Sequence, residues 1–315
     1  MKLLSLVIIL SVWLMSAPAV LATNGNKLGV HILETEELSE VAKLLPDGGF
    51  VTVPVRLDQL GEIKWQKFFD EADKFRFIPI IRLATSHNGK YWERPTKYDI
   101  VKFAGFFSKL DWHRGELIVI AFNEPNHAPE WGGKVDPANY GASLTFLVDW
   151  FATEPKQYLV LPAALDAAAG NSPATMALNL FLERLISEFP ETIDKLAGWN
   201  SHAYPNPGFA GNPTDSHKMS VRSYQYELDE IKKRTGKDLP AYITETGWDQ
   251  NKVKMKLIPQ YFQFAYQKIW QPDDRVMAIT PFLFNAQTMP FSAFSLLDTN
   301  EKPTLVYEMI KKLTL

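Results

Sequence analysis

Residues 117–125 read Leu-Ile-Val-Ile-Ala-Phe-Asn-Glu-Pro, a continuous apolar run that passes directly into an amide, a carboxylic acid and a proline. A strand that is apolar throughout is typical of a parallel sheet whose two faces are both covered. Asn123 and Glu124 follow at the carboxyl end of this run, and Pro125 cannot donate a hydrogen bond to a neighbouring strand. The stretch therefore predicts a buried parallel strand with polar groups at its end.

Seven further β-rich runs alternate with longer segments of helical period along the chain. In one of these segments Trp65, Phe68, Phe69 and Ala72 fall at i, i+3, i+4 and i+7, which is one face of a helix. Eight strand-then-helix units favour an α/β fold closed into a (β/α)8 TIM barrel, a single domain over residues 23–315. An open doubly wound sheet is the alternative, but no Gly-rich phosphate-binding turn follows the first run. The expected strands are 28–32, 50–55, 77–83, 117–122, 158–162, 199–203, 241–244 and 277–284, and the expected helices are 38–45, 65–75, 100–107, 140–151, 176–189, 224–231, 258–269 and 305–313.

Composition excludes several classes of function. The 315 residues carry a formal net charge of -3 and no Lys/Arg-rich run, so nothing favours a nucleic acid as partner. The absence of cysteine excludes disulfides, thiolate metal sites and cysteine nucleophiles. The histidines show no metal-ligand spacing and no cofactor fingerprint is present, so we expect neither a metal nor a cofactor, and nothing indicates an obligate protein partner.

The N-terminus predicts export. Lys2 is followed by an uncharged apolar run over residues 3–15 and then by small residues up to Ala22, the pattern of a secretory signal peptide. We expect residues 1–22 to be this signal and the protein to be secreted or held in the cell envelope. An uncleaved membrane anchor is the alternative, although the run is short for a spanning helix of about 20 residues.

Polar residues at strand ends are the candidate site, because the carboxyl ends of barrel strands open into one shared bowl. Glu124 follows the fourth expected strand and Glu245 follows the seventh, on roughly opposite sides of a ring of eight. Two facing carboxyl groups suit cleavage of a glycosidic bond, since one donates a proton to the leaving oxygen and the other attacks the anomeric carbon. A separation of about 5 Å gives retention, and about 6.5–9.5 Å gives inversion.

Asn123-Glu124-Pro125 and Glu245-Thr246-Gly247-Trp248, in these positions, resemble glycoside hydrolase clan A, which consists of retaining (β/α)8 enzymes. The resemblance implies that Glu124 is the general acid/base and Glu245 the nucleophile. It also implies that Asn123 holds the sugar 2-hydroxyl and that Tyr204 hydrogen-bonds the nucleophile.

The same resemblance assigns further residues around the pair. His202 would line the floor of the site, and Arg56 would support the nucleophile in preference to the competing Arg82. Many clan members carry a tryptophan at the end of strand eight as a platform for the sugar. This chain has none there, so Phe284 or Trp248 is expected to contact the sugar instead. Asp166, after the fifth expected strand, is either a site residue or a helix cap.

These observations predict an exported, retaining glycosidase that hydrolyses O-glycosyl bonds, endo-acting on a β-linked polysaccharide or oligosaccharide. The main alternative is a catalytically inactive carbohydrate-binding envelope protein on the same barrel. A metal-dependent deacetylase would need clustered His and Asp ligands at strand ends, whereas the candidates here are scattered. A two-lobed transport binding protein is disfavoured by the single run of eight units.

Overall fold

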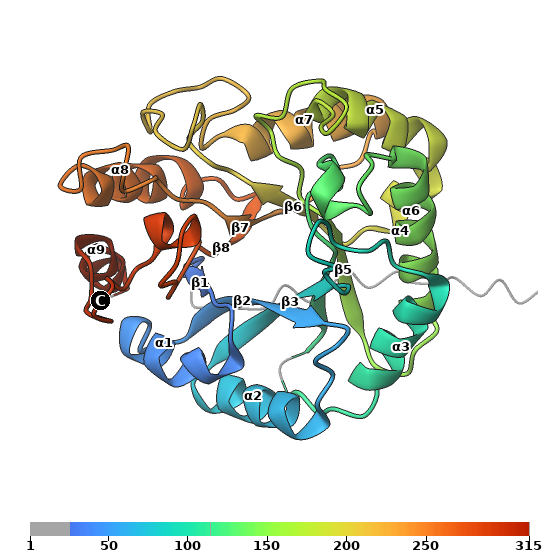
Figure 1. Cartoon of the computed structure of the whole chain (residues 1–315), viewed down its shortest axis with the longest axis horizontal. Coiled ribbons are helices and arrows are strands. Elements are labelled where there is room, and N and C mark those ends of the chain that lie inside the picture. Colours follow the sequence, from blue (N-terminus) through green and yellow to red (C-terminus); the bar gives the residue numbers. More distant parts are fainter. Residues whose placement is uncertain (1–25, 114, 315) are drawn as a thin grey trace, which may run out of the picture.

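The computed structural model describes residues 26–113 and 115–314, so the expected signal peptide 1–22 lies outside the described residues. Within these described residues, eight parallel strands form a central ring and helices surround it (Figure 1). The strands are β1 Gly29–His31, β2 Gly49–Arg56, β3 Phe77–Ala84, β4 Leu117–Ala121, β5 Tyr158–Pro162, β6 Trp199–His202, β7 Ala241–Glu245 and β8 Val276–Ile279. The helices are α1 Leu38–Leu44, α2 Glu62–Lys74, α3 Lys97–Phe107, α4 Pro137–Phe151, α5 Leu178–Glu188, α6 Pro190–Lys195, α7 Ser223–Thr235, α8 Ile258–Ala265 and α9 Leu305–Leu313. The predicted (β/α)8 barrel is confirmed.

The ring consists of two parallel ladders that meet on both sides. Strands β1 to β5 pair in chain order, and β6 to β8 form the second ladder. Leu28, beside β1, forms a parallel bridge with Ile279 of β8. Between β5 and β6, the backbone N–H of Ala197 donates to the carbonyl of Val160 at 3.4 Å. The carboxyl ends of all eight strands therefore face the same end of the barrel.

Successive side chains along each strand point alternately into the barrel and toward the helices, which divides the apolar core into two clusters. Ile118 and Ile120 of β4 belong to a small apolar cluster inside the barrel, whereas Leu117, Val119 and Ala121 belong to the larger cluster between strands and helices. The inner cluster fills the barrel with side chains, so the interior is packed and substrate access is confined to the rim. The inner cluster consists of Phe50, Ile78, Ile80, Ile118, Ile120, Leu159, Leu161, Tyr242 and Ala278.

The predicted helices form where an apolar stripe and a start signal coincide. On α2 the stripe of Trp65, Phe68, Phe69 and Ala72 is buried against the strands. Helix α4 begins at Pro137, and the side chain of Asp136 accepts from the backbone N–H of Asn139, the third residue of the helix, at 3.1 Å. Within the described residues, no helix combines the length and apolarity needed to cross a membrane.

Strand β8 ends five residues before the predicted boundary at 284. After Ile279 the chain leaves the ladder, and the N–H of Phe282 donates to Thr246 beyond β7 while the N–H of Phe284 donates to His31 of β1. Residues 280–284 therefore cross the rim between β7 and β1 instead of extending the strand. This crossing decides which aromatic side chain reaches the site.

Candidate active site

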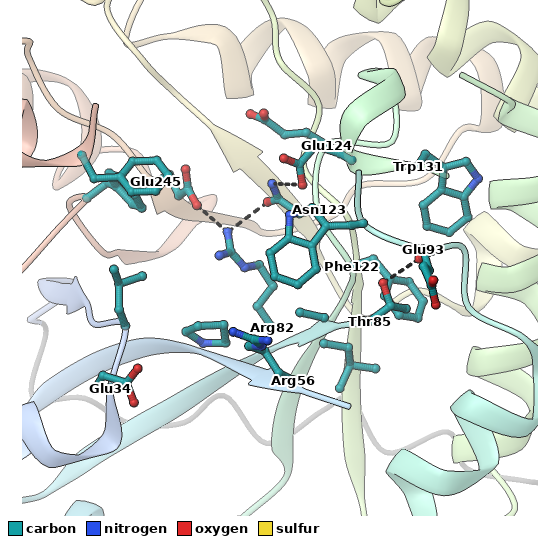
Figure 2. A pocket seen from close by; sticks show the side chains of 18 residues that line it. Glu34, Arg56, Arg82, Thr85, Glu93, Phe122, Asn123, Glu124, Trp131 and Glu245 are labelled. Atoms are coloured by element: carbon teal, nitrogen blue, oxygen red, sulfur yellow. Dashed lines mark hydrogen bonds and ion pairs between the residues drawn. The ribbon is translucent and has the colours of Figure 1, made fainter. Parts of the chain in front are cut away.

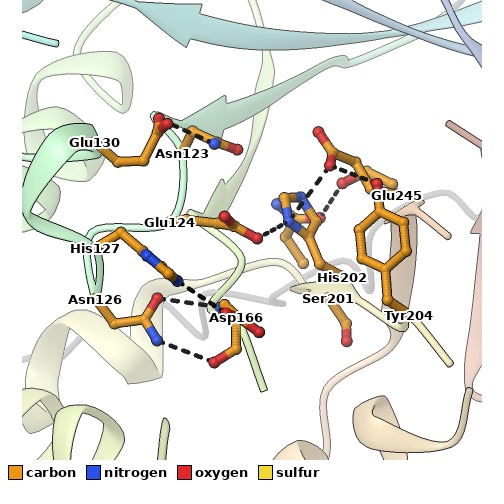
Figure 3. Close-up of polar contacts among 12 residues, drawn as sticks. Asn123, Glu124, Asn126, His127, Glu130, Asp166, Ser201, His202, Tyr204 and Glu245 are labelled. Carbon is orange, nitrogen blue, oxygen red and sulfur yellow. Dashed lines mark hydrogen bonds and ion pairs between the residues drawn. The ribbon is translucent and has the colours of Figure 1, made fainter. Parts of the chain in front are cut away.

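The structure brings Glu124 and Glu245 together around one imidazole (Figure 3). Glu124 lies just beyond β4 and Glu245 is the last residue of β7. The Nδ1 atom of His202 lies 2.7 Å from Oε1 of Glu124 and 3.7 Å from Oε2 of Glu245. The sum of these distances, about 6.4 Å, is an upper limit on the separation of the two oxygens. These two oxygens are therefore closer than the range of about 6.5–9.5 Å that leaves room for an intervening water.

The surroundings of Glu245 favour its ionised form. The residue is only 8% exposed, and Arg82 Nη1 donates to its Oε1 at 2.6 Å while the Tyr204 hydroxyl donates to its Oε2 at 3.0 Å. Burial raises the pKa of Glu245, but the charges of His202, Arg82 and His31 and the bond from Tyr204 outweigh burial and hold the pKa below its usual value. An ionised carboxylate fixed in this way is equipped to act as a nucleophile.

Glu124 has different surroundings. Its side chain is about a quarter exposed, and among the described residues its carboxyl group contacts His202 rather than an arginine. Its backbone φ is 26°, and Phe122 two residues earlier has φ 73°, a left-handed region that non-glycine residues seldom adopt. Such conformations cost about 1–3 kcal/mol each and concentrate at functional sites. Here they turn the chain as it leaves β4.

His202 and Tyr204 lie where the sequence predicted, beside the acidic pair. His202 is fully buried, and burial lowers its pKa. Glu245 and the hydrogen-bonded Glu124 raise the pKa by more than burial lowers it, so the net shift is upward. Burial and the neighbouring Glu245 also raise the pKa of Tyr204 well above its usual value, so its hydroxyl remains a hydrogen-bond donor. Both side chains stabilise negative charge between β4 and β7.

The arginine that supports Glu245 is Arg82, not Arg56, and this corrects the prediction. Arg56 lines the cleft, but its guanidinium pairs with Asp58 at 2.7 Å and lies over the ring of Trp92. The register explains the difference, because Arg56 pairs with Ala84 and Arg82 pairs with Pro54. Arg56 is thus two residues nearer the rim, about 6.6 Å along a strand, and Arg82 lies deep enough to reach Glu245.

The two predicted sugar platforms lie in the core, which is a second correction. Trp248 is 2% exposed, packs against Tyr261 and Phe262, and donates from Nε1 to the carbonyl of Gly211. Phe284 is also 2% exposed and belongs to the outer core. The aromatic residue from this part of the chain that lines the cleft is Phe282, because residues 280–284 cross the rim.

Asn123 is held at both ends of its amide. Arg82 Nη1 donates to Asn123 Oδ1 at 3.0 Å (Figure 2). Asn123 Nδ2 donates to Glu130 Oε2 at 3.1 Å (Figure 3). Glu130 is a third carboxyl group in the cleft that the sequence analysis did not select. Burial raises its pKa, the bond from Asn123 lowers it, and the charges of Glu124 and Glu245 raise it further; the net shift is upward. Its only signal in the sequence is an acid six residues after Glu124, in the loop that follows β4.

Asp166 supports the loop after β4 rather than contacting the acidic pair. Its Oδ2 lies 2.9 Å from Nε2 of His127, and its backbone N–H donates to Asn126 Oδ1. The bond to Asp166 is the largest cause that raises the pKa of His127. These contacts connect the segment that follows β5 with the turn that carries Glu124 (Figure 3).

The carboxyl groups open into a cavity of about 450 Å³, a size usual for small-ligand sites. Apolar and aromatic side chains form much of its wall, and Phe291 at the rim is 48% exposed. Among residues 26–113 and 115–314, no three His, Cys, Asp or Glu side chains are grouped so that they could hold a metal ion. The lining residues are Leu33, Glu34, Pro54, Arg56, Arg82, Leu83, Ala84, Thr85, Trp92, Glu93, Phe122, Asn123, Glu124, Glu130, Trp131, Glu245, Phe282 and Phe291.

Comparison with known proteins gives structural but not sequence matches. No protein-family model matches the chain, and no curated protein matches it. A family 39 glycoside hydrolase from the gut symbiont Bacteroides cellulosilyticus WH2 aligns with a TM-score of 0.62 and 15% identity over 91% of this chain and 63% of that one. A glucosidase from Croceicoccus marinus aligns with a TM-score of 0.66 and 8% identity over 92% of this chain and 66% of that one.

A family 5 xyloglucanase from Paenibacillus pabuli aligns with a TM-score of 0.53 and 14% identity over 88% of this chain and 89% of that one. The chain thus spans less than two thirds of the length of the family 39 enzyme, and also of the glucosidase. At these identities the likeness shows a shared barrel fold. That fold is the one that the resemblance to clan A implied, and the likeness assigns the chain to no family.

Proposed function

We propose that this protein is a retaining glycoside hydrolase with Glu245 as nucleophile and Glu124 as general acid/base. The observation that carries the proposal is the placement of both carboxyl groups within 3.7 Å of one nitrogen of His202, at the open end of the barrel. Barrel enzymes place their catalytic residues at this end. The similar structures include a family 39 glycoside hydrolase, a glucosidase and a xyloglucanase, which supports the same class of reaction.

The reaction has two displacement steps. In the first, Glu245 attacks the anomeric carbon while Glu124 gives its proton to the glycosidic oxygen, so the bond to the leaving group breaks and a glycosyl ester forms. In the second, Glu124 takes a proton from water, and the oxygen of that water displaces Glu245. Arg82 and Tyr204 stabilise the carboxylate of Glu245 before the first step and after the second.

Substrate and location extend this proposal. The cavity opens at the rim beside exposed Phe291, which supports endo-action on a β-linked polysaccharide over a sealed exo-pocket. The signal-like segment at 1–22 supports secretion or an envelope location, where such polymers are met. An inactive carbohydrate-binding protein on this fold would be favoured by an obstructed mouth, whereas both carboxyl groups here line the cavity.

The test is hydrolysis of β-glucans, mannans, xylans and galactans by the full chain and by Glu245→Ala and Glu124→Ala. Glu40→Ala is the control, because Glu40 lies on the exposed side of α1 and pairs with Lys43. On any glycan that the unmodified chain hydrolyses, Glu245→Ala should lower kcat by several orders of magnitude, since the covalent route is lost. Full turnover by Glu245→Ala would refute the assignment.

A further inference from the structure

Glu130 presents a carboxylate oxygen to the cleft beside the catalytic pair. It ends the short 3-10 helix Ala128–Glu130 after β4 and lines the cavity. Its Oε2 accepts from Asn123, while its Oε1 makes no hydrogen bond with any of the residues that the structure describes. Glu130 is partly buried and its Oε1 is open to the cavity, so a hydrogen-bond donor on a ligand can reach it.

The rest of the cleft adds negative charge. The acidic side chains that line it outnumber the basic ones by five to two. Arg82 is bound to Glu245 at 2.6 Å, and Arg56 is bound to Asp58 at 2.7 Å. Arg82 is therefore engaged by Glu245, whereas Arg56 shares an exposed pair with Asp58 and, among the acids, Glu34 pairs with Lys64 at 3.1 Å. The acidic lining residues are Glu34, Glu93, Glu124, Glu130 and Glu245.

We propose that the site takes a glycan whose sugar carries a free amino group, and that Glu130 binds its ammonium. This inference rests on the proposed function for the identity of the site. An ammonium supplies both the missing hydrogen-bond donor and the opposite charge, and charge-assisted hydrogen bonds are about twice as strong as neutral ones. A neutral hydroxyl supplies only the donor, and a uronic acid brings a like charge into a cleft that already has an excess of carboxyl groups.

The test is equilibrium binding, measured by calorimetry with three β-1,4-linked oligomers of one length: glucosamine, N-acetylglucosamine and glucose. The full chain carries Glu124→Gln to slow turnover, and a second protein adds Glu130→Gln. We expect the glucosamine oligomer to bind about tenfold to a hundredfold more tightly than the other two. Glu130→Gln should reduce that preference to about threefold or less. Glu40→Gln, which removes the same charge on exposed α1, should retain the preference.

Equal binding of the three oligomers in the Glu124→Gln protein would overturn the inference whether or not the Glu130 variant folds. A preference that survives in a folded Glu130→Gln protein would overturn the role of Glu130. The two proposals fail separately. Hydrolysis of neutral glycans without a preference for glucosamine refutes only the amino-sugar inference. Tight binding of glucosamine oligomers by a chain that hydrolyses no glycan refutes only the hydrolase.

Discussion

Replacing Arg82 with glutamine should move the acidic limb of the activity profile to higher pH. Arg82 donates to Glu245 at 2.6 Å, in a pair whose two side chains are 15% and 10% exposed. Burial raises the pKa of Glu245, and Arg82 is one of the charges that reverse this effect, so its loss must raise the pKa. A hydrogen bond to a charged group contributes about 1.5–3 kcal/mol. Because one pKa unit corresponds to about 1.36 kcal/mol, the expected rise is about one to two units.

The assay is kcat/KM against pH on a glycan that the unmodified chain hydrolyses, since this profile reports the ionisations of the free enzyme. Arg82→Gln should shift the acidic limb upward by about one to two pH units. Arg56→Gln is the matched control: it removes the same charge from the same cleft, but its guanidinium is bound to Asp58. A limb that moves with Arg56→Gln and stays in place with Arg82→Gln would refute the assignment of the supporting cation.

Three further outcomes follow from single contacts. Tyr204→Phe removes the 3.0 Å bond to Glu245 and should lower kcat/KM about tenfold, with the fold unchanged by circular dichroism; an unchanged rate would contradict that role. Trp248→Ala should lower the free energy of unfolding by about 3–5 kcal/mol in denaturant titration, since Trp248 is a core residue packed on Tyr261. A change in KM with unchanged stability would instead indicate that Trp248 contacts the substrate. Burial raises the pKa of Glu227 to about 7, against the hydrogen bonds that it accepts. The protonated form is therefore favoured in the folded state, and the unfolding free energy should fall by about 3 kcal/mol as the pH rises from about 4.5 to 7. Glu227→Gln should flatten this dependence between denaturation curves at pH 5 and pH 7.5, and an equally steep dependence in the variant would contradict it.

The barrel was predictable because the residue pattern within each segment is enough to indicate a strand or a helix. An apolar run such as residues 117–122 predicts a buried strand, and the stripe from Trp65 to Ala72 predicts a helix. Counting the units then places Glu124 and Glu245 at the ends of the fourth and seventh strands. Their approach across the ring follows from closure of the sheet, so this pair required no knowledge of loops.

What could not be predicted depends on register and on loop paths. Arg56 and Arg82 each lie near the end of an expected strand, so the sequence alone does not separate them. The pairing of β2 with β3 places Arg82 two residues deeper in the barrel than Arg56. The choice between Phe282 and Phe284 depends on the residue at which β8 ends, and apolar residues continue beyond that point. Glu130 reaches the cleft through the fold of the loop after β4, which has no periodic pattern to reveal it.

The most direct measurement is the anomeric configuration of the sugar first released, followed by proton NMR before mutarotation, on a glycan that the chain hydrolyses. The shared contact with His202 limits the separation of the Glu124 and Glu245 oxygens to about 6.4 Å, below the range for an inverting pair. The account predicts that the released sugar keeps the configuration of the substrate. An inverted product would contradict the direct attack of Glu245 on the anomeric carbon.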